Sequence, residues 1–266
     1  MNKKIGIIGA GSMGSAIAIG LSKEANVDLS IFNRSPEKLI QLKNIISFTS
    51  AEKLSDLIKD KLDILIIAVK PKDFNQLLEE IKNLNLSPET KIISVAAGIE
   101  IKTIAKFFPE NKIYRVMPNT PSQISAGMSA IAANSLGKDE ISEIEQIFKS
   151  IGETLIIEEE QMHVATAIAG SGPAYFFKII EALAEAGTKQ GLSLVEAEKL
   201  AIETMYGAAL LLKKSKLSPK DLRVQVTSPN GTTQAALESF EDSQIDSVID
   251  AAVAAACKRS VELAKS

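Results

Sequence analysis

The stretch IGIIGAGSMG, residues 5–14, limits the possible folds of this chain more than any other feature of the sequence. Gly9, Gly11 and Gly14 have the spacing G-x-G-x-x-G, directly after an apolar, strand-like run and at the start of a helical pattern. In that context the first glycine makes a tight turn, the second lets the backbone approach a pyrophosphate, and the third allows close packing of helix on strand. The N–H groups at the start of the helix can then bind phosphate. We therefore predict a nucleotide-binding βαβ unit; a plain glycine turn is the alternative.

The first 158 residues continue this pattern, because short apolar runs alternate with helical segments. Several runs are almost entirely apolar, as expected for parallel strands covered by helices on both faces. The expected strands are residues 4–8, 28–32, 45–48, 64–68, 91–95, 113–116, 129–133 and 154–157. Ser35 is placed to cap a helix that begins with Pro36. We predict an α/β fold in which residues 1–158 form a doubly wound Rossmann-type sheet.

From about Glu159 the apolar residues recur with the 3.6-residue period of helices. Long helices are expected at residues 161–191, 195–214 and 243–264, and the last of them places residues from Ile245 to Ala256 on one apolar face. The segments EALAEAG and AAVAAAC are rich in small residues, which permit close helix packing. A few amphipathic helices beside a separate sheet domain rarely bury their apolar faces alone. We therefore predict that residues 159–266 form an all-helical domain that associates with a second subunit.

Composition excludes several classes of partner. The net charge of −3 and the pI of about 5.5 give no basic surface for nucleic acid or an anionic membrane. The longest uncharged run, residues 116–137, contains two Pro and two Asn and is no membrane span. Cys257 is the only cysteine, which excludes an internal disulfide. With no signal-peptide pattern at the N-terminus, we expect a cytoplasmic protein.

The sequence SIFNRSPE, residues 30–37, bears on the choice of cofactor. An NAD-preferring fold usually has Asp or Glu at the end of the second strand, whereas this chain has Asn33 and Arg34. A guanidinium suits the 2′-phosphate of NADP, so we predict NADP(H) as cofactor, with NADH as a weaker alternative. A solvated surface arginine is the other interpretation. Ala68–Pro71 and the run SVAAGI from Ser94 follow later strands, where ligands bind, although simple packing also explains both.

The chain has no obvious strong acid or base for catalysis. His163, the only histidine, is expected to be a packing or surface residue of a helix, and Lys178 a solvated helix residue. No cluster of residues has the spacing of metal ligands. Ketone chemistry usually requires a positioned acid or base, but an imine nitrogen can be protonated near neutral pH before hydride arrives. A hydride cofactor without such a group therefore favours reduction of a carbon–nitrogen double bond, with orientation as the main contribution of the enzyme.

Six motifs occur in order along the chain: GAGSMG, AVKP, SVAAGI, RVMPNTP, AGSGPAYFF and VTSPNGTTQAALE. Together they closely resemble the pyrroline-5-carboxylate reductase family, and the resemblance covers essentially the whole chain. The first motif is generic, whereas the last three are specific to the family. The resemblance implies NADPH-dependent reduction of 1-pyrroline-5-carboxylate to proline, the last step of proline biosynthesis. It also implies a homodimer with interlaced helical domains, of the kind that is often gathered into a larger ring of dimers.

The resemblance also implies the residues of a substrate site. The loop at residues 226–233 would hold the substrate carboxylate through backbone N–H groups, which lead into a helix at about Gln234 and form an anion site. Thr233 would be the catalytic residue that hydrogen-bonds the imine nitrogen. The substrate-binding residues implied are Glu159, Ser228, Asn230, Gly231, Thr232 and Thr233. An interhelical turn without function is the alternative. Asn230 replaces the usual Gly of the family, and Asn is the residue that best tolerates a positive φ in its place.

By the same matching, the cofactor contacts begin at the glycine loop and continue along the carboxyl ends of the strands. The cofactor-binding residues implied are Gly9, Gly11, Ser12, Met13, Gly14, Asn33, Arg34, Ser35, Ala68, Val69, Lys70, Pro71, Val95, Ala96, Ala97 and Asn119. Two other functions stay open. One is a related imine or ketone reductase with a larger substrate. The other is a non-catalytic NADP(H)-binding sensor, which would have no reason to keep Thr233 and its polar loop.

Overall fold

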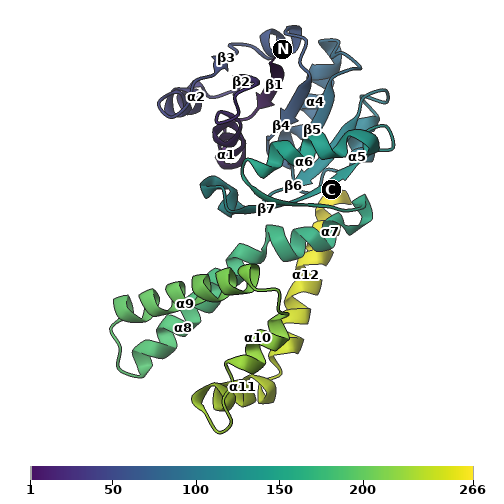
Figure 1. Ribbon diagram of the computed structural model, residues 1–266. Coiled ribbons are helices and arrows are strands. Elements are labelled where there is room, and N and C mark those ends of the chain that lie inside the picture. Colours follow the sequence, from purple (N-terminus) through teal and green to yellow (C-terminus); the bar gives the residue numbers. More distant parts are fainter. Residues whose placement is uncertain (1, 266) are drawn as a thin grey trace. The chain divides into compact units, whose positions relative to one another are not determined.

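The computed structural model describes residues 2–265, and within them the chain forms two compact units (Figure 1). The first unit runs to Ser171 and resumes at Ala255, and the second comprises Gly172–Ala254. The first contains a β-sheet with helices, and the second contains helices only. The sequence predicts both kinds of structure, an α/β sheet unit and an all-helical unit.

Within the described residues the sheet has eight strands in the order β3-β2-β1-β4-β5-β6-β7-β8. Their bounds are β1 Lys3–Ile8, β2 Val27–Phe32, β3 Thr49–Ser50, β4 Ile64–Ile67, β5 Lys91–Ser94, β6 Ile113–Met117, β7 Gly127–Ala133 and β8 Gly152–Ile156. The chain builds outward from β1 to β3 on one side and then crosses back to place β4 on the other side of β1. This reversal is the topological switch point, outside which doubly wound sheets bind their ligands.

All neighbouring strands are parallel except β6 and β7, which pair antiparallel. The connection between them contains only the 3₁₀ turn η2, Thr120–Ile124. A parallel pair needs a crossover of a dozen or more residues, usually with a helix. The short connection therefore forces β7 to run against β6.

The expected strand at residues 45–48 is wrong. The strand in this region, β3, has two residues, Thr49–Ser50, and pairs with β2. Ile46 and Phe48 pack against the core from a loop, while Ile45 is exposed. Their apolar character reflects this packing, which a short run of sequence does not distinguish from strand pairing.

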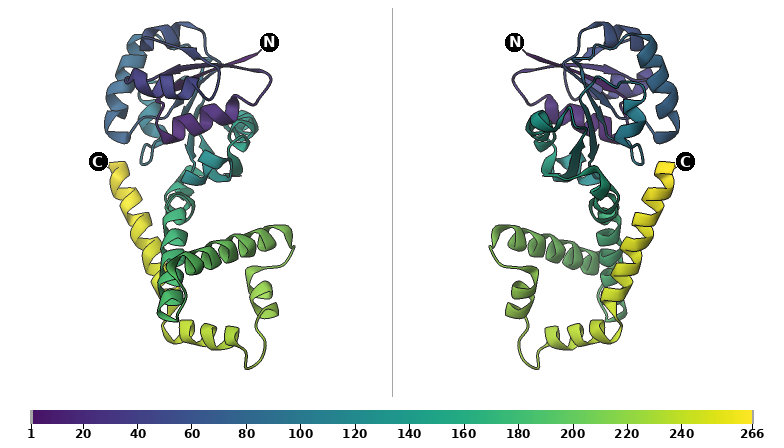
Figure 2. Two further views of the ribbon diagram at one scale, coloured as in Figure 1. Left: turned by 90° about the vertical axis from the view of Figure 1, so that its left-hand side faces the viewer. Right: turned by 90° about the vertical axis from the view of Figure 1, so that its right-hand side faces the viewer.

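Two layers of helices cover the two faces of the sheet (Figures 1 and 2). One layer consists of α1 (Ser12–Leu21), α2 (Pro36–Lys43) and α6 (Ile141–Lys149). The other consists of α3 (Leu54–Lys59), α4 (Phe74–Asn83) and α5 (Ile101–Ala105). Along β4, Ile64 and Ile66 face the first layer and Leu65 and Ile67 face the second, and all four are fully buried. This double burial explains why the strand is entirely apolar.

Ser35 occupies the N-cap position of α2, and Pro36 is the first residue of the helix, as predicted. The serine side chain, however, makes no capping hydrogen bond. Its carbonyl oxygen instead accepts a hydrogen bond from Nδ2 of Asn33, at 2.8 Å. The start of α2 is therefore fixed by a side chain of the preceding loop.

The expected helix at residues 161–191 is interrupted. The chain forms a 3₁₀ turn (η4, Glu159–Gln161), a short α7 (Met162–Ala165) and a π-helical turn (η5, Thr166–Gly170) before α8 begins at Gly172. Met162 and Ala167 are fully buried, Met162 against the sheet core, so this segment belongs to the first unit. The compact units thus divide after Ser171, and the domain boundary expected between residues 158 and 159 stays a prediction.

The second unit contains α8 (Gly172–Lys189), α9 (Leu194–Lys214), α10 (Pro219–Gln225), α11 (Thr232–Asp242) and most of α12 (Ile245–Lys265). Helices α8 and α9 pack against each other near the turn that joins them, and Figure 2 shows α9 running away from α8 at a wide angle. Ala184 and Ala197 are buried, and a Cβ on Gly187 would lie 3.1 Å from that of Ala197. The small residues therefore permit the close helix packing that the sequence predicts.

Tyr114 is the largest of the fully buried side chains in the core. Its ring packs between the sheet and Gly137, where a Cβ would come within 2.9 Å of it. The hydroxyl has no hydrogen-bond partner among the described residues, and burial raises the pKa of this phenol to about 12. A buried hydroxyl without a partner costs free energy.

Tyr114→Phe keeps the ring and removes this hydroxyl. We expect the free energy of unfolding to stay the same or to rise by about 1–2 kcal/mol. Tyr114→Leu, which removes ring volume, should instead destabilise the protein by roughly 1–3 kcal/mol. Thermal and urea unfolding at one fixed protein concentration measure both. A Phe variant more than about 1 kcal/mol less stable than the unsubstituted chain would show that the hydroxyl is satisfied in solution.

Candidate active site

The glycine loop between β1 and α1 has no room for side chains on its sheet side. Gly9 has φ +105°, and a Cβ there would lie 2.6 Å from the carbonyl oxygen of Ala68. A Cβ on Gly14 would lie 1.9 Å from the carbonyl oxygen of Gly9. Gly11 is the N-cap of α1, and nothing described lies within 4 Å of the place where its Cβ would be. Gly9 thus makes the turn, Gly14 allows the close packing, and Gly11 leaves the open approach that a bound pyrophosphate requires.

Asn33 fixes the shape of this loop. Its Oδ1 accepts a hydrogen bond from the backbone N–H of Ala10, and its Nδ2 donates to the carbonyl oxygen of Ser35, both at 2.8 Å. One side chain thus ties the glycine loop to the loop after β2. Asn33 positions the two loops, and its predicted contact with the cofactor stays a prediction.

A cleft of about 260 Å³ opens at the carboxyl ends of β1, β2 and β4, at the switch point of the sheet. It brings together eight of the predicted cofactor residues, namely Gly9, Gly11, Asn33, Arg34, Ser35, Ala68, Val69 and Lys70. The cleft lining does not include Ser12, Met13, Gly14, Pro71, Val95, Ala96, Ala97 and Asn119. Sequence reasoning missed Lys38, Asp73, Leu77 and Glu80, which also line it. The last three follow β4 in η1 (Pro71–Asp73) and α4, and no motif marks them.

Arg34 lines the cleft, and its side chain is 58% exposed. Its guanidinium is 3.7 Å from Oδ1 of Asp73 and 4.0 Å from Oε1 of Glu80. Exposed pairs at such distances contribute little free energy, so they do not prevent Arg34 from binding a phosphate. Lys38 and Lys70 add positive charge to the same cleft. The residues present therefore fit a 2′-phosphate.

Asn119 has a structural position in the first unit. Its Oδ1 accepts a hydrogen bond from the N–H of Met128, and its Nδ2 donates to the carbonyl oxygen of Ala169. The side chain thus connects β7 to the π-helical turn η5. Its predicted contact with the cofactor stays a prediction.

Glu159 belongs to an ionic cluster around the buried Arg115. Its Oε1 accepts a hydrogen bond of 2.7 Å from the N–H of Ile101, the first residue of α5, and lies 3.4 Å from Nη1 of Arg115. Arg115 is only 3% exposed. Burial lowers the pKa of its guanidinium, and the charge of Glu159 opposes that effect. Glu159 balances a buried charge here, and its predicted contact with substrate stays a prediction.

His163 joins the same cluster to the end of α12. Its Nδ1 lies 3.0 Å from Oγ of Ser260, and its Nε2 lies 3.9 Å from a carboxylate oxygen of Glu100. Burial, followed by the nearby charge of Arg115, lowers the pKa of the imidazole, which is therefore neutral near pH 7. As predicted, His163 is a packing residue. Lys178 is an exposed residue of α8, also as predicted, and it pairs with Glu181.

The polar loop that precedes α11 lies in the second unit. Asn230 has φ +58°, the conformation that allows Asn to replace Gly. Its N–H donates to Oε1 of Gln234, and the N–H of Gly231 donates to the carbonyl oxygen of Ser228. Gly231 is the N-cap of α11, which begins at Thr232, earlier than the predicted Gln234. The N–H groups of Thr232 and Thr233 therefore stand at an uncapped helix start, where an anion binds favourably.

No helix among residues 2–265 combines the length and apolar character needed to cross a bilayer. In the same part of the chain, no group of three or more His, Cys, Asp and Glu side chains could hold a metal ion.

Comparison with known families divides the chain into two matched regions. Residues 4–98 match the family described as NADP oxidoreductase coenzyme F420-dependent. Residues 159–263 match the family described as pyrroline-5-carboxylate reductase dimerisation.

Known proteins match the chain over nearly its whole length. Pyrroline-5-carboxylate reductase 2 of Bacillus subtilis is 36% identical in an alignment of 267 positions, which covers 98% of this chain and 95% of that protein. The structure of a pyrroline-5-carboxylate reductase from Coxiella burnetii is 33% identical, with a TM-score of 0.93 and all of both chains covered. The NADP-bound pyrroline carboxylate reductase of Plasmodium falciparum is 32% identical, with a TM-score of 0.85, and the match covers 99% of this chain and 98% of that one.

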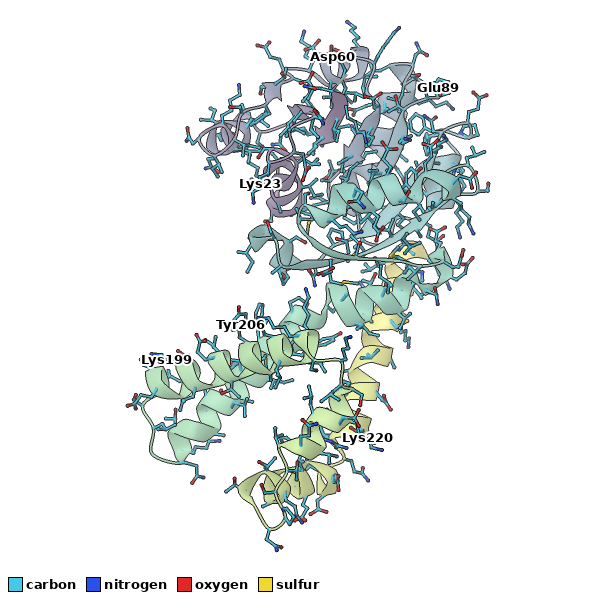
Figure 3. All side chains as sticks on the ribbon, in the orientation of Figure 1. Lys23, Asp60, Glu89, Lys199, Tyr206 and Lys220 are labelled. Carbon is cyan, nitrogen blue, oxygen red and sulfur yellow. The ribbon has the colours of Figure 1, made fainter. Side chains whose placement is uncertain are left out.

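Arg34→Ala tests the assignment of the 2′-phosphate position. A charge-assisted hydrogen bond contributes about 1.5–3 kcal/mol, so the dissociation constant for NADPH should rise roughly ten- to a hundredfold. The value for NADH should change by less than about threefold. Fluorescence titration of both cofactors measures this. Lys23→Ala is a matched control, because Lys23 is exposed and lies outside the cleft lining (Figure 3). Equal losses for the two cofactors would overturn the assignment.

Proposed function

Because this chain belongs to the pyrroline-5-carboxylate reductase family, we propose that it reduces 1-pyrroline-5-carboxylate to proline with NADPH, in the last step of proline biosynthesis. The match to reductases of that name over almost the whole chain carries this proposal. The glycine loop and the cationic cleft at the switch point support it. We infer a cytoplasmic enzyme, with NADH as a weaker alternative cofactor.

The loop before α11 supplies the groups that the substrate requires. The substrate carboxylate binds the N–H groups of Thr232 and Thr233 at the helix start. The hydroxyl of Thr233 hydrogen-bonds the imine nitrogen, because a hydroxyl can donate or accept without carrying charge. Ser228, Asn230 and Gly231 shape the loop around these two residues.

Gly9, Gly11 and Arg34 of the cleft would hold NADPH, which when bound would supply the hydride for the carbon of the C=N bond. The nitrogen takes a proton before hydride arrives, so that the product is a neutral ring amine with its carboxylate unchanged. The protein orients the imine for this step and needs no strong acid.

The second unit has a large exposed apolar surface. Phe176, Phe177 and Tyr206 are 55%, 64% and 65% exposed, and Figure 3 shows Tyr206 on α9. The other large exposed apolar side chains that α8, α9 and α12 contribute to this unit are Ile179, Leu183, Leu194, Val195, Leu200, Ile202, Leu211, Ile245, Val248 and Ile249. Surfaces of this kind mark sites of association. We infer that these helices form an obligate homodimer, and that the dimers assemble further into a ring.

Thr233→Val tests the proposed catalytic residue, because it keeps the shape of the side chain and removes the hydroxyl. Losing one hydrogen bond should cost about 1–3 kcal/mol of transition-state stabilisation. The kcat/KM for pyrroline-5-carboxylate should therefore fall roughly five- to a hundredfold. Thr233→Ala should lose slightly more. Loss of NADPH absorbance measures the rate, and fluorescence titration should show NADPH binding within a small factor of the unsubstituted chain.

The same assay decides between the alternative functions. An unsubstituted chain that oxidises NADPH with bulkier imines but not with pyrroline-5-carboxylate is a related reductase. A chain that binds NADPH and reduces no imine is a sensor. Full activity of Thr233→Val would leave the hydroxyl without a role, and the loop would act only through its backbone.

If the homodimer is obligate, no active monomer should exist. Analytical ultracentrifugation over a range of concentrations should show a dimer or a multiple of it, with activity confined to those species. Phe177→Asp places a charge on the apolar surface of α8 and should lower both association and activity. Lys220→Asp, at an exposed lysine of α10 and so outside the three helices α8, α9 and α12, is the control (Figure 3). An active species near 28.5 kDa would contradict the dimer.

A further inference from the structure

Two carboxylates face Arg34 across the cleft. Asp73 ends the turn η1, and Glu80 lies on α4, and their oxygens are 3.7 and 4.0 Å from the guanidinium nitrogens. Dinucleotide-binding folds usually place such an acid at the end of the second strand, where this chain has Asn33 and Arg34. The acids here come instead from the segment that follows β4.

A neighbouring side chain holds Glu80 at the cleft. Nε2 of Gln76, one turn earlier on α4, donates a hydrogen bond of 2.9 Å to the same Oε1 that approaches Arg34. The side chains of Asp73 and Glu80 are 38% and 44% exposed, so both carboxylates stay partly in water. They are too far from Arg34 for tight hydrogen bonds, and their charge acts on whatever enters the cleft.

We propose that Asp73 and Glu80 determine the cofactor specificity of this enzyme, by lowering its preference for NADPH over NADH. The 2′-phosphate of NADPH carries negative charge, so each carboxylate repels it and also competes with it for Arg34. NADH has a ribose 2′-hydroxyl at that place, and a hydroxyl can donate a hydrogen bond to a carboxylate. The two acids therefore provide, from the other side of the cleft, the group that NAD-preferring folds have after the second strand.

Because the two acids are partly exposed, solvent screens their charge and each effect is moderate. Each carboxylate should change the ratio of the two affinities by about three- to tenfold. The inference rests on the proposed binding of the adenosine end of the cofactor in this cleft. It does not depend on which imine the enzyme reduces.

The test uses Asp73→Asn, Glu80→Gln and the double variant of the full chain. Fluorescence titration without imine gives the dissociation constants for NADPH and NADH. Each single variant should raise the affinity ratio in favour of NADPH by about three- to tenfold, and the double variant by about ten- to a hundredfold. The differences should shrink when the ionic strength rises to about 0.5 M. Glu79→Gln is the matched control, because it removes the same charge from an exposed position of α4 outside the cleft lining.

Two results would overturn the inference. An unchanged ratio in the double variant would show that the acids do not act on the cofactor. Weaker NADPH binding in that variant would show that they orient Arg34 for the phosphate. Failure of the proposed function is a separate outcome: a chain that binds both cofactors but does not reduce pyrroline-5-carboxylate still gives an affinity ratio that decides this inference.

Discussion

The contact between Gly9 and Gly14 is the constraint on which the cofactor site depends. The carbonyl oxygen of Gly9 occupies the space that a Cβ at position 14 would need, 1.9 Å away. Helix α1 can therefore lie directly over the end of β1, with its uncapped first turn at the cleft. The same loop is pressed against Ala68 after β4, and Asn33 ties it to the loop after β2. The loops that follow β1, β2 and β4 are thus held in contact with one another, and the cleft lies beside them.

The sequence predicts the structure correctly where a local backbone geometry requires one type of residue. The spacing of Gly9, Gly11 and Gly14 predicts the turn, the open approach and the close packing that the structure has there, and the fully apolar run of β4 predicts burial on both faces. Sequence was insufficient where tertiary packing decides. Asp73 and Glu80 reach Arg34 only because the reversal at β1 brings α4 beside the end of β2. Likewise, the loop around Phe48 and the break at Thr166–Gly170 depend on contacts with distant residues, which a periodic pattern does not contain.

The cluster around Arg115 shows how a charge is accommodated inside the first unit. A guanidinium that is 3% exposed requires a partner, because an uncompensated buried charge is strongly destabilising. Glu159 provides that partner and also caps the start of α5 through Ile101. Glu100 and the neutral His163 lie beside it, and His163 contacts Ser260. The burial of Arg115 therefore fixes the positions of Glu159 and His163, which follow the last strand of the sheet.

The contact between His163 and Ser260 has a consequence for the order in which this protein is made. Residues 255–265 pack within the sheet unit, where the backbone of Leu263 also approaches Gly98, yet they follow the whole of the second unit in the chain. During translation the sheet unit is therefore completed only after every residue of the helical unit has left the ribosome. Domains usually fold one after another from the N-terminus. In this protein the sheet unit begins first and is completed last. A chain that stops within the helical unit therefore lacks part of both units.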